Sequence, residues 1–285
     1  MNIVITSDST TDLSVELKER YNIAILPLGI NLGDKTFIDG VNITPDDIYA
    51  HHDKTGELPK TSACNVGDCI DFFKNFADQG KTVIHFTISS DMSSTYNNCR
   101  MAAEEFENIY VIDTKNLSTG GGLLVIAAAE MALKGMEAKD IVAEIEKLIP
   151  CVDASFIIDN LDYLHKGGRC STVAMLGANL LKLKPCIEVA DGKMGVGKKY
   201  RGRFLDVLKT YVTERIGDGS DIDLNRVFIT HAGCDKDIVD AVVEHVKNSA
   251  DFKEVFVTRA GCTISSHCGA DTLGILFIRK NPINQ

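Results

Sequence analysis

The first 150 residues alternate short runs of β-branched and aromatic residues with segments that have helical spacing. The runs at 3–5, 82–88 and 108–113 are typical of buried strands, and a helix-like segment follows each of them. Strands that alternate with helices across short connections form parallel or mostly parallel sheets. The sequence therefore predicts an α/β fold, with a mostly parallel sheet in a first lobe over residues 1–152.

The second half has a different order of elements. An Asp191-Gly192 pair between two apolar runs predicts a β-hairpin over 185–196. The remaining runs predict a mixed, partly antiparallel sheet, so we expect a second α/β lobe over residues 153–285. The expected single strands are 155–158, 226–231, 254–259 and 273–279, and the expected helices are 203–216, 236–248 and an Ala-, Leu- and Gly-rich one over 172–183.

Charge and apolar patterning exclude several classes of protein. A net charge of −10 argues against a general nucleic-acid or anionic-membrane binder, because phosphate contacts need a basic surface. The N-terminal sequence has no basic segment followed by an apolar one, so we expect no signal peptide. No apolar run reaches membrane-spanning length. The nine cysteines, without a secretory signal, indicate reduced thiols and a cytoplasmic protein.

Two segments resemble known cofactor motifs only in part. Residues 262–268 contain two cysteines and a histidine, but their spacing fits no common zinc pattern, so we expect no metal ion. Residues 192–198 read G-x-x-x-x-G-K, yet Lys199 replaces the hydroxyl that would hold magnesium in a phosphate loop. The Asp-Gly hairpin explains these glycines better. A phosphatase or nucleotide-binding protein is therefore the weakest hypothesis, and we expect no cofactor.

A run of hydroxyl side chains lies between the predicted strand at 82–88 and a helix expected from about Ser93. The first-turn amide groups of a helix have no partners within the helix, and the helix dipole favours negative charge there. The hydroxyls would add donors, so this segment is typical of an anion site. Ser93 could equally be an N-cap, which is a common role for serine.

Three more segments have a similar position along the chain. Residues 7–12, 61–65 and 116–122 follow predicted strands or precede predicted helices. The first two are dominated by hydroxyls and the third by glycine. Ligands bind at the carboxyl ends of parallel strands, so these segments could converge on one crevice and hold an anion with neutral donors.

His267 and Arg169 are further candidates, both in segments that we expect to be loops. An imidazole in a polar loop could donate to a carboxylate, although a lone histidine is more often structural. Arg169 follows Gly167-Gly168 and has a planar donor group that suits a carboxylate, a phosphate or a protein partner. A surface salt bridge explains Arg169 equally well.

Six segments follow one another along the chain in a recognisable order. They are ITSDSTTDL at 5–13, TSACN at 61–65, ISSDMSSTYNN at 88–98, VIDTKNLSTGGGLLV at 111–125, LDYLHKGGRCS at 161–171 and SSHCGADTLGI at 265–275. Together, in this order, these segments resemble the DegV family of bacterial fatty-acid-binding proteins. The resemblance implies two α/β lobes with a ligand tunnel between them. It also implies a lipid-binding protein without chemistry of its own, which presents a long-chain fatty acid to a separate ATP-dependent kinase subunit for acyl phosphate formation and phospholipid synthesis.

The resemblance also implies roles for individual residues. Thr61 and Ser93 would donate to the fatty-acid carboxylate, and His267 would close the head-group site. Ser62 and Ser94 would be neighbours of the two donors. Arg169 looks like the family arginine that lies near the kinase contact or at the mouth of the site.

Three departures from the family pattern affect these roles. Ala63-Cys64 replace Gln-Pro, Ser94 replaces Gly, and 269–271 replace Gly-Pro-Gly. Asp271 would repel a carboxylate if it faced inward.

Several questions stay open from the sequence. The apolar segments 123–133 and 172–183 could line a tunnel or fill a core. A small-ketone phosphotransferase subunit of the dihydroxyacetone-kinase type is the alternative function, with His267 contacting the ketone. The sequence does not determine the acyl chain, the oligomeric state or the kinase partner, and a transient membrane contact stays open.

Overall fold

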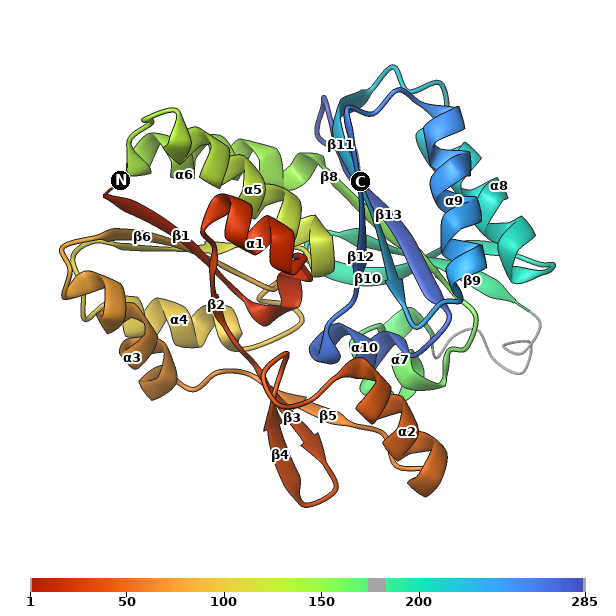
Figure 1. Cartoon of the computed structure of the whole chain (residues 1–285), viewed down its shortest axis with the longest axis horizontal. Helices are drawn as coiled ribbons and strands as arrows, with labels where there is room; N and C mark the ends of the chain where they lie inside the picture. The colour runs from red at the N-terminus through yellow and green to blue at the C-terminus, as the bar shows by residue number, and fades with distance from the viewer. Residues whose placement is uncertain (1, 174–182, 284–285) are drawn as a thin grey trace.

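The computed structural model describes residues 2–173 and 183–283, and it contains two main β-sheets with helices packed on them (Figure 1). The first sheet has the order β2-β1-β6-β7, and all of its strands are parallel. This confirms the parallel sheet that the alternation of strands and helices predicts. Its strands are β1 (Ile3–Asp8), β2 (Ala24–Leu26), β6 (Thr82–Thr87) and β7 (Ile109–Asp113).

The second sheet has the order β10-β9-β8-β13-β11-β12 and is mixed, as expected. Only β11 and β12 pair in parallel among its described neighbours, and the other pairs are antiparallel. Helices α8 (Phe204–Ile216) and α9 (Lys236–Ser249) cover one face. The strands are β8 (Val152–Ile158), β9 (Lys184–Ala190), β10 (Lys193–Tyr200), β11 (Ile222–Ala232), β12 (Glu254–Arg259) and β13 (Thr272–Arg279).

Helix α5 (Ser118–Leu133) lies between the two sheets (Figure 1). Its buried residues share one apolar core with β1 and β6 on one side and with β8 and β13 on the other. This position explains why the helix is apolar nearly all round. Because α5 joins both sheets, the division into lobes at residue 152 stays a prediction, although the mixed sheet begins at Val152.

The other helices of the first half complete the layers around the parallel sheet. Helices α3 (Val66–Ala77) and α4 (Thr95–Ala103) pack on one face. The opposite face carries α5 together with α1 (Val15–Tyr21) and α6 (Ala138–Leu148).

A third, small sheet lies beside the end of the parallel sheet. Strand β3 (Gly29–Leu32) pairs antiparallel with β4 (Lys35–Ile38) and with β5 (Lys60–Ser62). The Gly33-Asp34 turn signal in the sequence allows a hairpin or an excursion, and β3 and β4 form the hairpin. Helix α10 (Cys262–Cys268) packs on this sheet, and α2 (Pro45–Thr55) and α7 (Asp162–Gly167) pack on α10, so the end of the chain returns to the first half.

Several expected boundaries are wrong. The predicted loop at 116–122 is helical from Ser118, because Gly120, Gly121 and Gly122 lie inside α5. A Cβ on Gly122 would lie 2.9 Å from Leu13 Cδ2 and 3.0 Å from Thr11 O, so these glycines allow close packing rather than a loop.

Two further segments differ from expectation, and one lies outside the description. The sequence favours Thr11 or Asp12 as the cap of a helix over 13–21, but the cap of α1 is Ser14, since residues 9–11 form a 3₁₀ turn of their own. The segment that contains His267 is helix α10 rather than a loop. Most of the helix expected over 172–183 falls outside the described residues.

Candidate functional site

A cavity of about 240 Å³ lies where the carboxyl ends of the parallel strands face helix α10. Its wall contains all six residues that the sequence singled out, although they come from positions 61 to 267. Apolar side chains complete the wall. The lining residues are Leu28, Thr61, Ser62, Ala63, Ile88, Met92, Ser93, Ser94, Leu117, Arg169, Met194, Thr263, Ile264, His267 and Cys268.

Thr61 and His267 form the closest polar pair in this wall. Thr61 Oγ1 lies 2.8 Å from His267 Nε2, which joins β5 to α10. The imidazole Nδ1 is buried and has no hydrogen-bond partner among the described residues. Burial, and the nearby positive charge of Arg169, lower the pKa of His267 to about 4. The imidazole is therefore neutral at neutral pH.

The tautomer of His267 decides what Thr61 can do. If Nε2 carries the proton, it donates to Thr61 Oγ1, and the hydroxyl hydrogen of Thr61 is free to donate into the cavity. If Nδ1 carries the proton, Thr61 donates to Nε2 instead. Only the first tautomer makes Thr61 a donor for an anion.

Ser93 lies at the start of α4, beside its hydroxyl neighbour Thr95. Ser93 Oγ accepts the Thr95 amide at 3.2 Å and lies 2.8 Å from Thr95 Oγ1. The residue at the N-cap position is Ser94, whose side chain makes no capping bond. Ser93 therefore satisfies a helix-start amide, as the cap interpretation expects, and also lines the cavity.

Arg169 and Ser62 lie at the exposed side of the cavity. Arg169 makes no ion pair with any described residue, and its Nη1 donates to Gly167 O at 2.8 Å. The alternative of a surface salt bridge is therefore not borne out within residues 2–173 and 183–283. Asp271, whose charge was a concern, is exposed and does not line the cavity.

The loop at 7–12 does not reach the cavity, contrary to expectation. Ser7 Oγ and Thr11 Oγ1 lie 2.9 Å apart, so these hydroxyls pair with each other. Asp8 accepts the Ile88 amide at 2.8 Å and thereby supports the next loop along the sheet. Of the four expected segments, three contribute lining residues.

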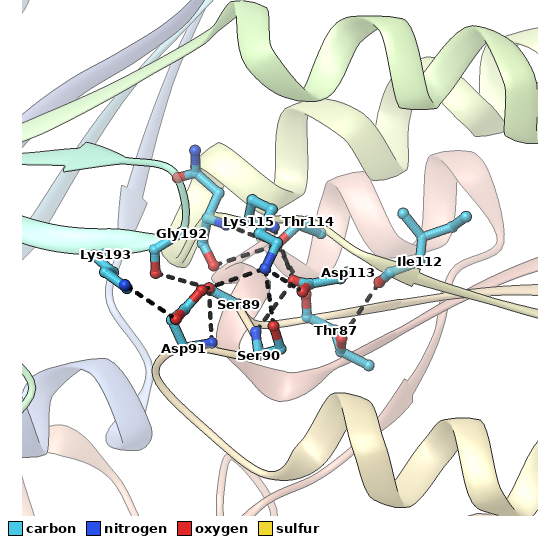
Figure 2. A network of polar contacts seen from close by, with 11 residues as sticks. Thr87, Ser89, Ser90, Asp91, Ile112, Asp113, Thr114, Lys115, Gly192 and Lys193 are labelled. Atoms are coloured by element: carbon cyan, nitrogen blue, oxygen red, sulfur yellow. Dashed lines mark hydrogen bonds and ion pairs between the residues drawn. The ribbon is translucent and has the colours of Figure 1, made fainter. Parts of the chain in front are cut away.

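The turn of the β9–β10 hairpin is held against the loop that follows β6 (Figure 2). Ser89 Oγ donates to Gly192 O at 2.7 Å, and Asp91 lies 3.3 Å from Lys115 Nζ and 3.7 Å from Lys193 Nζ. Both turn residues, Asp191 and Gly192, have positive φ, as a tight hairpin turn requires. The G-x-x-x-x-G-K segment is therefore a hairpin rather than a phosphate loop.

Four apolar lining residues lie outside the four segments that the sequence indicated could converge on one crevice: Leu28, Met194, Ile264 and Cys268. Ile264 and Cys268 are four residues apart, and this helical spacing is the one signal that could have indicated them. The others lie at element ends, where an apolar residue that lines a cavity looks like any core residue.

Metal and thiol chemistry receive no support here. No group of three or more potential metal-ligating side chains occurs in the part of the chain that the structure describes. All nine cysteines are free and buried.

None of the described helices combines the length and apolar character needed to cross a bilayer.

Replacing Gly167 with alanine should displace the His267 imidazole. An added Cβ would lie 2.7 Å from His267 Nδ1, which is too close for the ring to stay on Thr61. We expect the pKa of His267 to rise from about 4 toward its ordinary value near 6.5, because the displaced ring is better solvated. An NMR titration of the histidine ring signals measures this. Gly195→Ala adds a methyl group to open space and should leave the titration unchanged.

Asp12→Asn should make the protein less sensitive to alkaline pH. Burial raises the pKa of Asp12 to about 8, so the folded state holds a proton that the unfolded state releases near pH 4. This contribution to stability is present at low pH and is lost as the pH rises to about 8. An asparagine can still accept from Gly261 N and donate to Ser118 Oγ.

Chemical denaturation at two pH values measures the effect of Asp12→Asn. We expect equal stability near pH 4 and an advantage of ~2 kcal/mol or more for the variant at pH 9. Burial also raises the pKa of Asp8, to about 6, but Asp8 is present in both proteins and cancels in the comparison. A difference that does not change with pH would contradict the assignment.

Comparisons with known proteins extend over nearly the whole chain. A family model described as an uncharacterised protein of the DegV family matches residues 2–280. A DegV domain-containing protein from Clostridium perfringens is 35% identical over 202 residues, which cover 70% of this chain and 72% of the relative.

Two solved structures have the same architecture. A fatty-acid-binding DegV family protein from Thermus thermophilus has a TM-score of 0.89 and 27% identity, and the match covers 98% of this chain and 100% of the other. A stearic acid-binding protein from Eubacterium ventriosum has a TM-score of 0.84 and 30% identity, with 97% and 98% covered. The predicted α/β fold and its family resemblance are confirmed.

Proposed function

Because the chain belongs to the DegV family, we propose that it binds a long-chain fatty acid, with the carboxylate in the cavity that Thr61, Ser93 and His267 line. The observation that carries this proposal is the pairing of neutral donors with apolar walls in one cavity. The relatives described as fatty-acid-binding proteins support the ligand class.

The polar end of the cavity suits a carboxylate. Thr61 and Ser93 are hydroxyl donors from different elements, and neutral His267 orients Thr61 without adding a charge. A hydrogen bond to a charged group contributes about 1.5–3 kcal/mol. Two such bonds, with the amide groups at the start of α4, would hold the carboxylate without a fixed cation deep in the site.

The apolar end of the main cavity adjoins a second cavity. A second, smaller cavity of about 20 Å³ shares Leu117, Ile264 and Cys268 with the first. The surface that lines this second cavity is mostly apolar, and Phe156, Ala232 and Leu276 contribute to it. An acyl chain that entered between Leu117 and Ile264 would gain about 0.8 kcal/mol for each buried methylene group.

The protein would act as a carrier rather than as an enzyme. The proposed head-group contacts are two hydroxyls and an imidazole that is a weak base near pH 7, because its pKa is lowered to about 4. We propose that a separate ATP-dependent kinase phosphorylates the bound carboxylate, and that exposed Arg169 at the mouth contacts this partner or the carboxylate. The proposal includes a cytoplasmic location and needs no cofactor.

Titration calorimetry with palmitate and oleate tests the proposed function. We expect saturable binding of one equivalent, with a negative heat-capacity change because apolar surface is buried. Dihydroxyacetone is the comparison ligand, because it represents the small-ketone alternative. A shift in melting temperature with dihydroxyacetone, and none with either fatty acid, would favour the small-ketone alternative and contradict ours.

A further inference from the structure

Helix α10, which carries His267, has no capping side chain of its own. Its N-cap residue is Gly261, so the amides at its start need acceptors from elsewhere. Cys262 N donates to Asp39 Oδ1 at 2.9 Å, and Thr263 N donates to Asp39 Oδ2 at 3.1 Å. A carboxylate at this end also complements the helix dipole. The capping group therefore comes from more than 200 residues away.

The Asp39 carboxylate is buried and receives four donors in total. Besides the two amides, it accepts from Thr263 Oγ1 at 2.6 Å and from Ser9 Oγ at 2.9 Å. All four partners can donate, and two of them are amides that cannot accept. An asparagine at this position would direct its own N–H groups at one of those amides, so an amide cannot replace the carboxylate.

The backbone of Asp39 anchors the other half of the polar pair. Asp39 N donates to Leu28 O at 2.9 Å, directly before β3. Strand β3 then pairs with β5 in a register that sets Ile30 opposite Thr61. The main chain of Asp39 therefore supports β3, the strand that pairs with Thr61's strand β5.

We propose that Asp39 is a positioning residue for the Thr61–His267 pair: its side chain fixes helix α10, and its backbone fixes the strand beside β5. The 2.8 Å contact between Thr61 Oγ1 and His267 Nε2 links β5 to helix α10. Asp39 does not line the cavity, so it acts on a ligand only through the pair. Its role in ligand binding rests on the proposed function, whereas its effect on His267 does not.

Asp39→Asn should weaken the contact that holds the His267 imidazole on Thr61 in the ligand-free protein. We expect the ring signals of His267 to move and its pKa to rise from about 4 toward 6.5, because the first turn of α10 loses an amide acceptor. NMR of protein with labelled histidine measures this, and His267→Gln assigns the signal among the seven histidines. The charge that faces the ring, on Arg169, is unchanged in the variant.

Affinity for palmitate should fall about 10-fold in Asp39→Asn, and by less than 3-fold when the same change is made in a His267→Ala protein. Asp237→Asn is the matched control, since it removes an exposed carboxylate from the first turn of α9. We expect no change in the His267 signals or in affinity for that control.

Lower stability with unaltered His267 signals would overturn the proposal, since Asp39 would then be only structural. If Asp39→Asn does not fold, Ser9→Ala removes one of the four bonds to Asp39, together with the bond from Leu28 N to Ser9 Oγ. This variant should move the same signals in the same direction, and unmoved signals would again overturn the proposal. If wild-type protein binds no fatty acid, the proposed function fails, but the NMR result still decides the role of Asp39.

Discussion

Replacing both Thr61 and Ser93 with alanine should lower the affinity for palmitate or oleate by about 100-fold. Each hydroxyl is expected to donate to the carboxylate, and a bond of this kind contributes about 1.5–3 kcal/mol. Two bonds at the lower end of that range correspond to a factor of about 100. Titration calorimetry on the double variant measures the loss.

A matched control for this double variant is Thr210→Ala with Ser220→Ala. Both residues are exposed and belong to the part of the chain around α8, away from the cavity. The control should bind like the wild-type protein. If the Thr61 and Ser93 variant binds equally well, the proposed carboxylate contacts are wrong, even if the ligand class is right.

Ala232→Leu should shift the binding preference of the protein toward fatty acids with shorter chains. Ala232 is 2% exposed and lines the inner cavity, where a larger side chain would occupy the path of the acyl chain. If about four methylene groups lose their place, the affinity for palmitate should fall by about 3 kcal/mol, which is roughly 100-fold. Octanoate, which would not reach Ala232, should bind within about 3-fold of its wild-type affinity.

Comparison of chain lengths by calorimetry checks this prediction, and thermal unfolding shows whether the larger side chain is tolerated. Ala77→Leu is the control, because Ala77 is half-buried in α3 and lines neither cavity. Equal losses for palmitate and octanoate would mean that the inner cavity is not the path of the chain.

The fold followed from the sequence wherever local pattern and tertiary environment agree. The alternation of strands and helices predicted the parallel sheet, and the Asp191-Gly192 pair predicted the hairpin. Helix α10 could not be predicted in this way, because its amides are capped by Asp39 and Asp12 from a distant part of the chain. Local rules contain no information on acceptors that folding brings from so far away.

The candidate site was predictable in its polar residues, with the exception of Thr263, and not in most of its apolar ones. Thr61, Ser93 and His267 were indicated by the family resemblance and by hydroxyl runs at strand ends, and the structure gathers them in one cavity wall. The same chemistry at Ser7 and Thr11 was misleading, since those hydroxyls pair with each other. A hydroxyl that binds a ligand and one that binds its neighbour look alike in sequence.

The most direct test of the proposed function is the mass of the molecule that the protein carries when it is purified from bacterial cells. Denaturing the purified protein and recording the mass spectrum of the released lipid should give one or a few fatty acids, and the double Thr61 and Ser93 variant should release much less. Protein that releases no fatty acid, and takes up none after incubation with palmitate or oleate, would contradict the proposal that this chain is a fatty-acid carrier.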